Sequence, residues 1–210
     1  MEAPDDLPAR QARPKQNGES SENFKKYGKL FDVDEEHFEE FYSLLRHVNF
    51  AKSEYFLRKG ETCNYLGFVT KGSMRSFYIN ESGKEISFMF HFENQFFTDY
   101  ESILRNKKSN LNIQSQEKAE VLLLHKDDLQ KLYSKEPYWQ EFGRKMTEKI
   151  YLDAKKRIEN LLYHSPEKRY INLLQENPSA FQHVPQKHIA SYLGITPPSL
   201  SRIRKRISIN

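Results

Sequence analysis

The stretch that decides the fold lies near the C-terminus and reads Gln186-Lys-His-Ile-Ala-Ser-Tyr-Leu-Gly-Ile-Thr-Pro-Pro-Ser-Leu-Ser-Arg-Ile-Arg-Lys-Arg206. Its spacing predicts a helix-turn-helix. Ala190 is small where the two helices would cross, and Gly194 supplies the positive φ that the turn needs. Thr196 is a good N-cap for the second helix, and Pro197 and Pro198 fit its first turn because N–H groups there have no intrahelical partner. The buried positions would be Ile189, Leu193, Ile195, Leu200 and Ile203.

The predicted second helix carries an unusual density of positive charge. From Tyr163 onward seven basic residues face two acidic ones, although the net charge of the whole chain is only +4. Four of the seven lie within Arg202–Arg206, which indicates a polyanionic partner. In a major groove, Arg202 is the best candidate to read a guanine edge, and the three basic residues after it would contact phosphates. The full set of predicted DNA-contacting residues is Lys187, Thr196, Ser199, Ser201, Arg202, Arg204, Lys205 and Arg206. The alternative is a helical hairpin with a basic surface.

The first 22 residues have a different composition from the rest of the 210-residue chain. Residues 1–22 are rich in Pro and in polar and charged residues such as Ser, Gln and Glu, which predicts a disordered tail. They lack the apolar core of a signal peptide, and no apolar run is long enough to span a membrane, so we expect a cytoplasmic protein. The single cysteine, Cys63, cannot form an internal disulfide or hold a metal cluster alone, and a buried, inert role is favoured over a redox one. No cofactor or metal is predicted.

The central region changes from helical to strand-like spacing. Glu35 to His47 has apolar residues at helical intervals. From Phe50 to about His125, short runs rich in β-branched and aromatic residues alternate with turns such as that at Gly83, which predicts a β-sandwich or jelly roll. We therefore assign residues 23–135 to an antiparallel β-roll sensor domain.

A long helical stretch follows, from Lys126 to Tyr163, and is expected to break near Pro137. Within it an apolar stripe recurs every three or four residues and must be buried against another surface. We predict that residues 136–163 form a dimerisation helix that packs on a second copy of itself; packing on its own barrel is the alternative. The predicted interface residues are Trp139, Phe142, Met146, Ile150, Ala154, Ile158 and Leu161. Residues 164–210 would form the DNA-binding domain.

With these residues in hand, the chain resembles the Crp/Fnr superfamily of bacterial transcription regulators, and most of all its Bacteroidetes-type branch. The segment Leu193-Gly-Ile-Thr-Pro-Pro-Ser-Leu-Ser-Arg-Ile-Arg-Lys205 matches that branch's recognition segment, and Arg58-Lys-Gly-Glu61 and Val69 to Arg75 match its barrel pattern. The resemblance implies an α+β protein with a cyclic-nucleotide-binding-like β-roll, a long dimer helix and a winged helix-turn-helix. Any wing would come from about Ala180–Val184.

Departures from the family pattern bear on the ligand. Family members that bind cyclic AMP carry Gly-Glu at the start of a short helix and Arg-Ser about ten residues later. Here the first stretch reads Phe97-Thr-Asp-Tyr-Glu-Ser102 and the second falls near Lys108-Ser-Asn110, so Asp99 would repel a phosphate and cyclic AMP is not expected. The family's cysteine cluster is missing, and nothing specific supports haem ligation by His91. A small apolar effector could use Phe88, Phe90, Phe97, Tyr100 and Lys108, although an ordinary core explains the aromatic residues as well.

The function expected from these features is sequence-specific transcription regulation. The protein would bind an inverted-repeat operator as a homodimer, contact RNA polymerase, and respond to an unidentified effector if there is one. It would not be an enzyme. A ligand-binding module that signals through protein contacts is one alternative. A cupin-like enzyme is another, but strand-spaced His-x-His is absent from the sequence.

Overall fold

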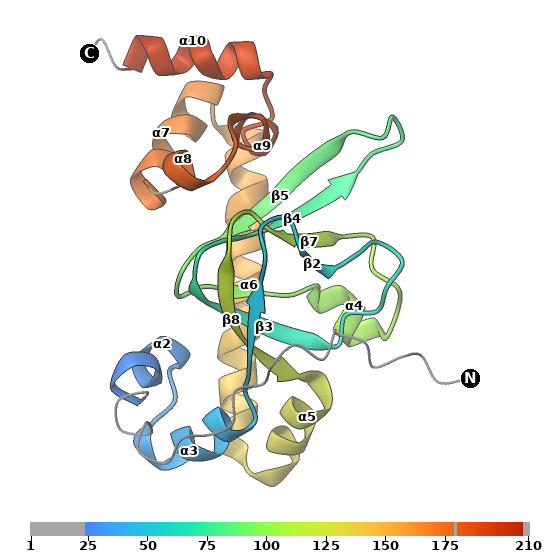
Figure 1. The fold of residues 1–210 in the computed structure, drawn as a ribbon. Helices are drawn as coiled ribbons and strands as arrows, with labels where there is room; N and C mark the ends of the chain where they lie inside the picture. The colour runs from blue at the N-terminus through green and yellow to red at the C-terminus, as the bar shows by residue number, and fades with distance from the viewer. Residues whose placement is uncertain (1–23, 179, 208–210) are drawn as a thin grey trace.

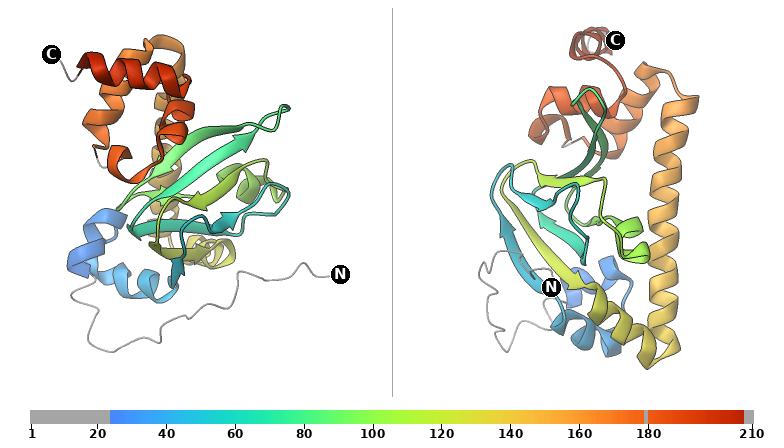
Figure 2. Two further views of the ribbon diagram at one scale, coloured as in Figure 1. Left: turned by 45° about the horizontal axis from the view of Figure 1, so that its top comes forward. Right: turned by 90° about the vertical axis from the view of Figure 1, so that its right-hand side faces the viewer.

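The computed structural model describes residues 24–178 and 180–207, and it confirms the predicted α+β architecture. A β-roll occupies the centre, a helical layer lies at one end, and a small helical domain lies at the other (Figure 1). One long helix runs past the β-roll and joins the two ends (Figure 2). The predicted tail, residues 1–22, lies outside the described residues.

The β-roll consists of two four-stranded antiparallel sheets. The first has the order β1-β8-β3-β6 and contains β1 (Arg46–Phe50), β8 (Ala119–His125), β3 (Tyr65–Lys71) and β6 (Phe96–Phe97). The second has the order β2-β7-β4-β5 and contains β2 (Tyr55–Leu57), β7 (Asn112–Ser115), β4 (Met74–Ile79) and β5 (Glu85–His91). A bulge between Ser76 and Phe77 interrupts the β4–β5 register. The short helix α4 (Tyr100–Arg105) follows β6.

The inner faces of both sheets form the core of the β-roll. Val69, Met74 and Ile113 are fully buried there, together with Phe97 and its neighbours. Gly67 is required at its position, since a Cβ atom would lie 2.2 Å from the Phe97 ring. His91 is also buried, and its Nε2 is hydrogen bonded to Ser76 Oγ at 2.9 Å. This ring nitrogen, which could otherwise bind a haem iron, therefore already has a partner.

A second core lies at the N-terminal end. It joins η1 (Phe24–Gly28), α2 (Lys29–Phe31) and α3 (Glu35–Ser43) to α5 (Lys126–Lys135) and the start of α6 (Pro137–Tyr163). The predicted helix over Glu35–His47 ends at Ser43 instead, because Arg46–Phe50 pairs with β8. Trp139 is fully buried and Phe142 nearly so in this core, packed against Phe41. This corrects their predicted role, since neither has surface left for a second copy.

The break in the long helical stretch falls where the sequence predicts it. Pro137 takes the first position of α6, where its missing N–H costs no hydrogen bond. The predicted 136–163 segment is therefore a continuous helix, Pro137–Tyr163.

The C-terminal domain contains α7 (Pro166–Glu176), α8 (Ala180–His183), α9 (Gln186–Tyr192) and α10 (Pro197–Ile207). Its core includes Phe90 and Phe92 from β5 and its exit, so the β-roll and the helical domain share a core. The segment expected to supply a wing forms helix α8, and the described parts of 164–207 contain no strand.

Candidate nucleic-acid interface

The helix-turn-helix forms at the predicted residues. Helix α9 ends at Tyr192, and Gly194 turns the chain with a φ of +65°. The Oγ1 of Thr196 accepts a hydrogen bond from the backbone N of Ser199 at 3.4 Å, which is the predicted N-cap of α10. Leu200 and Ile203 turn inward to the core of the domain. The opposite side of α10 faces outward at the end of the molecule (Figure 1).

The outward face of α10 carries the predicted DNA-contacting residues. Ser201, Arg202, Lys205 and Arg206 are exposed, whereas Ser199 and Arg204 are half-buried. Neither Arg202 nor Lys205 has an ion-pair or hydrogen-bond partner within the described part of the chain. Thr196 and Lys187 are exposed at the start of α10 and α9. Two cationic side chains without an internal partner, on one exposed helix face, suit an external anion.

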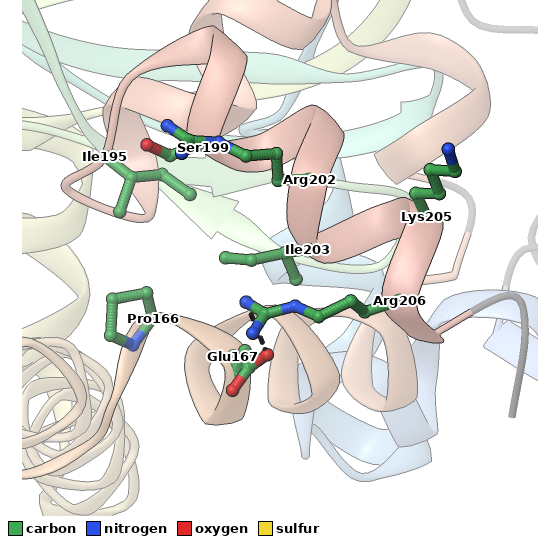
Figure 3. A pocket seen from close by; sticks show the side chains of 8 residues that line it. All are labelled: Pro166, Glu167, Ile195, Ser199, Arg202, Ile203, Lys205 and Arg206. Carbon is green, nitrogen blue, oxygen red and sulfur yellow. Dashed lines mark ion pairs between the residues drawn. The ribbon is translucent and has the colours of Figure 1, made fainter.

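A groove of about 710 Å³ lies between α10 and the first turn of α7. Its lining is Pro166, Glu167, Ile195, Ser199, Arg202, Ile203, Lys205 and Arg206. Glu167 and Arg206 meet across it in an ion pair of 2.7 Å, while Lys205 extends away from Glu167 (Figure 3). The groove therefore combines cations of α10 with one acidic side chain, and one of the cations is already paired.

The exposed apolar residues of α6 define a second surface. Tyr151, Ile158 and Leu161 are exposed and Ala154 is half-buried between them, at the alternating spacing of three and four residues found in coiled-coil seams. We call these four residues the α6 seam. Leu162, also exposed, lies next to it. Of the predicted interface residues, Ala154, Ile158 and Leu161 lie on the seam. Met146 is half-buried against the N-terminal core, and Ile150 is half-buried one turn before Ala154.

The predicted effector residues do not line a common pocket. Phe97 belongs to the β-roll core, whereas Phe90 packs among residues of the C-terminal domain. Phe88 is half-buried against the β-roll core, the Tyr100 hydroxyl contacts the Thr147 hydroxyl on α6 at 2.9 Å, and Lys108 is exposed. This corrects the predicted grouping. Phe88 and Phe90 are two residues apart and would share one face of a regular strand, but the register shift of β5 at Phe88 lies between them and they pack in different cores.

The start of α4 is closed by an internal carboxylate. Asp99 Oδ1 accepts a hydrogen bond from the backbone N of Ser102 at 3.2 Å, and Oδ2 accepts one from Ser109 Oγ at 2.6 Å. Lys107 lies on the loop that follows α4. Its Nζ donates a hydrogen bond to Glu101 at 2.6 Å and not to Asp99. Both oxygens of Asp99 thus use local donors that an incoming anion would need.

Comparisons with known proteins place this geometry in a wider context. Residues 47–136 match the family model of the cyclic nucleotide-binding domain. No curated protein matches the chain. Among solved structures, FixK2 from Bradyrhizobium japonicum has a TM-score of 0.69 at 18% identity, covering 79% of this chain and 85% of that chain.

Two further solved structures support the same architecture. A Crp/Fnr-family transcriptional regulator from Eubacterium rectale has a TM-score of 0.67 at 15% identity, covering 88% of each chain. The c-di-GMP-responsive global regulator CLP from Xanthomonas campestris has a TM-score of 0.65 at 16% identity, covering 84% of this chain and 92% of that chain. At such identities the likeness shows the fold alone, and this fold is the one that the resemblance implies.

Some residues of these surfaces were missed by sequence reasoning. Tyr151 and Leu162 were left out because the longest apolar stripe on α6 passes through Trp139, and only the structure shows which part of it is already covered. Seven-residue spacing from Tyr151 to Ile158 was the available signal. Glu167 was counted only as a charge, since nothing in the sequence places the first turn of α7 beside Arg206.

Proposed function

We propose that this chain, which contains a cyclic nucleotide-binding domain and has the fold of the Crp/Fnr transcription regulators, binds inverted-repeat DNA as a homodimer and thereby regulates transcription. The observation that carries the proposal is the exposed face of α10, where Arg202 and Lys205 have no partner within the described residues. The protein acts without catalysis, in the cytoplasm, and in contact with RNA polymerase.

The exposed face of α10 reads the DNA. Placed in a major groove, this helix brings Arg202 to the base edges, where a guanidinium can donate two hydrogen bonds to guanine. Lys205 and Arg206 contact phosphates and set the register of the helix. Arg206 must exchange its bond with Glu167 for a phosphate, so DNA binding breaks one internal ion pair.

The α6 seam forms the homodimer. Two copies packed along Tyr151, Ala154, Ile158 and Leu161 would remove exposed apolar surface from water. The helix-turn-helix motifs then project from the same end of both copies, because α6 leads directly to that domain (Figure 1). Half-sites about one helical turn apart follow from this arrangement.

The β-roll does not bind cyclic AMP in this proposal. A cyclic phosphate at the start of α4 would meet the Asp99 carboxylate, which already occupies the Ser102 and Ser109 donors. Thermal unfolding with and without millimolar cyclic AMP tests this point, since a ligand that binds only the folded state raises the midpoint. A reproducible rise of several degrees would contradict it.

DNA binding is tested by selection from a random duplex pool, followed by fluorescence anisotropy across a salt series. We expect an inverted repeat, with an affinity that falls steeply as salt rises. Replacing Arg202 with Ala should cost about 1–3 kcal/mol and relax one symmetric base position. Arg105→Ala is the control, because Arg105 is also an exposed arginine but lies on α4, away from α10 (Figure 1).

The outcomes separate the proposal from its rival. Equal losses in the Arg202 and Arg105 variants would show that general charge, and not the face of α10, drives binding. A failure to enrich any sequence, at low salt and with a dimeric protein, would overturn the proposal and favour a module that signals through protein contacts.

A further inference from the structure

Helix α6 contains two arginines. The side chain of Arg144 is exposed, whereas that of Arg157 is buried. Its residue is 5% exposed, although it lies in the C-terminal half of a helix whose neighbouring charged residues are exposed. Burying a guanidinium is costly unless its donors are satisfied, so its surroundings require an explanation.

The guanidinium bonds to the backbone of two other elements. Nε donates to the carbonyl of Phe88 on β5 at 2.8 Å, and Nη2 donates to the carbonyl of Tyr192 at the end of α9. A longer contact of 3.4 Å joins Nη2 to the carbonyl of Ser87. The guanidinium carbon also lies 3.9 Å from the centre of the Tyr192 ring. No carboxylate pairs with it in the described part of the chain.

The backbone acceptors of Arg157 make this contact rigid. Backbone carbonyls cannot change rotamer as a carboxylate side chain can, and the guanidinium presents its donors in a rigid planar fork. One side chain of α6 therefore fixes the position of strand β5 and of the last turn of α9. The β5–α9 contact is tied independently, since Ser87 N donates to Ser191 Oγ at 2.9 Å and Ser191 Oγ donates to the carbonyl of Glu85 at 3.1 Å.

We propose that Arg157 is the positioning residue that sets the angle between the α6 helix and the helix-turn-helix, and so sets the half-site spacing that the dimer accepts. The inference rests on the proposed function. It assigns to a residue that does not touch DNA the control of a property of the operator. In the dimer, the α6 seam sets how the two α6 helices pack on each other. Arg157 sets how each α6 helix is oriented relative to its own helix-turn-helix.

Operator spacing is the measurement that isolates this role. Each added or removed base pair between half-sites rotates one relative to the other by about 35°, because a helical turn holds about 10–10.5 base pairs. We expect the wild type to lose at least tenfold in affinity for a spacer changed by one base pair. Arg157→Lys keeps the positive charge but removes the planar guanidinium. For this variant, a one-base-pair change of the spacer should lower the affinity by only about threefold or less.

The control is Lys156→Ala. Lys156 is the adjacent residue on α6, and it makes an exposed ion pair with Glu176 of α7 at 3.0 Å, so it also links α6 to the C-terminal domain. Exposed pairs of this kind contribute little. This variant should keep the spacing preference of the wild type.

A second variant tests the same role in case Arg157→Lys does not fold. Tyr192→Leu removes the ring stacked on Arg157 but keeps the carbonyl that the guanidinium bonds, and we expect it to relax the spacing preference partly. Circular dichroism and sedimentation establish that each variant is a folded dimer. If Arg157→Lys does not fold, the Tyr192→Leu result decides.

Different results would overturn the role of Arg157 and the proposed function. A folded variant with the spacing preference of the wild type, or a wild type that accepts all spacings equally, overturns the role of Arg157 while DNA binding stands. Absence of any sequence-specific binding by the wild type overturns the proposed function, and this inference with it.

Discussion

Replacing Ile158 with Lys should dissociate the proposed dimer. Ile158 lies on the α6 seam and is 53% exposed in the single chain, so about half of its side chain is available to a partner. A lysine at this position would bring two like charges together where the two copies meet. We expect the variant to remain folded, because the exposed half of the side chain does not contribute to the core of its own chain.

The expected magnitude follows from the exposed area. Full burial of an isoleucine side chain contributes about 1.5–3 kcal/mol, so half of it contributes about 1 kcal/mol per copy and about 2 kcal/mol per dimer. Repulsion between two hydrated ammonium groups adds about 1 kcal/mol. The total of about 3 kcal/mol corresponds to a roughly 100-fold weaker dimer.

Sedimentation velocity from nanomolar to micromolar concentration measures this change. Leu152→Lys is the matched control, because Leu152 is 59% exposed on the same helix but lies about 120° around the axis from Ile158. Its dimer affinity should change by less than threefold. The reasoning is refuted if Leu152→Lys dissociates the dimer and Ile158→Lys does not, or if the wild type is monomeric at micromolar concentration.

Three further changes test other parts of the structure. Glu167→Gln frees Arg206 and removes a negative charge from the DNA-facing groove, so affinity for the selected operator should rise about threefold and the salt slope should steepen by up to about 1; an unchanged slope in the anisotropy series would contradict this. Gly67→Ala should lower the free energy of unfolding in urea by about 1–3 kcal/mol through a clash with the Phe97 ring, and adding Phe97→Leu should restore part of the loss; no rescue would place the strain elsewhere. Burial lowers the pKa of His91 to about 4, so only the unfolded state gains a proton below pH 6.5, and stability should fall by about 2 kcal/mol between pH 6.5 and 5. His91→Gln should make the loss shallower but should not abolish it, because burial also lowers the pKa of His188 to about 4. An equally steep loss in the His91→Gln variant would assign the dependence to other groups.

Local signals in the sequence were enough to predict two parts of the fold. Gly194 and Thr196 specify a turn and a cap by backbone chemistry that acts within a few residues, so the helix-turn-helix could be placed accurately. Pro137 likewise marks the start of α6, since it fits only the first turn of a helix. Strands β3, β4, β5 and β8 lie in the region from Phe50 to about His125 where β-branched and aromatic runs predict strands. The two-residue strand β6 and the three-residue strand β2 are too short to show a period.

The partners of each apolar or charged side chain could not be predicted in the same way. Periodicity shows that Trp139 and Ile158 both lie on apolar positions of one helix, but not that Phe41 packs on the first while about half of the second stays exposed. The bond between Asp99 and Ser109 joins residues ten apart across a loop whose path has no sequence signature. Long-range packing settles such contacts, and a single sequence does not encode its outcome in any short pattern.

Because Phe90 and Phe92 belong to the core of the C-terminal domain, the boundary drawn at residue 164 does not separate two exchangeable parts. A fragment that begins there would leave both rings behind and open its own interior to water. Grafting the helix-turn-helix onto another sensor would require carrying the β5 strand with it, or rebuilding the outer face of the host's sheet. An exchange of the helical domain between two such chains would therefore have to include the strand on which that domain rests.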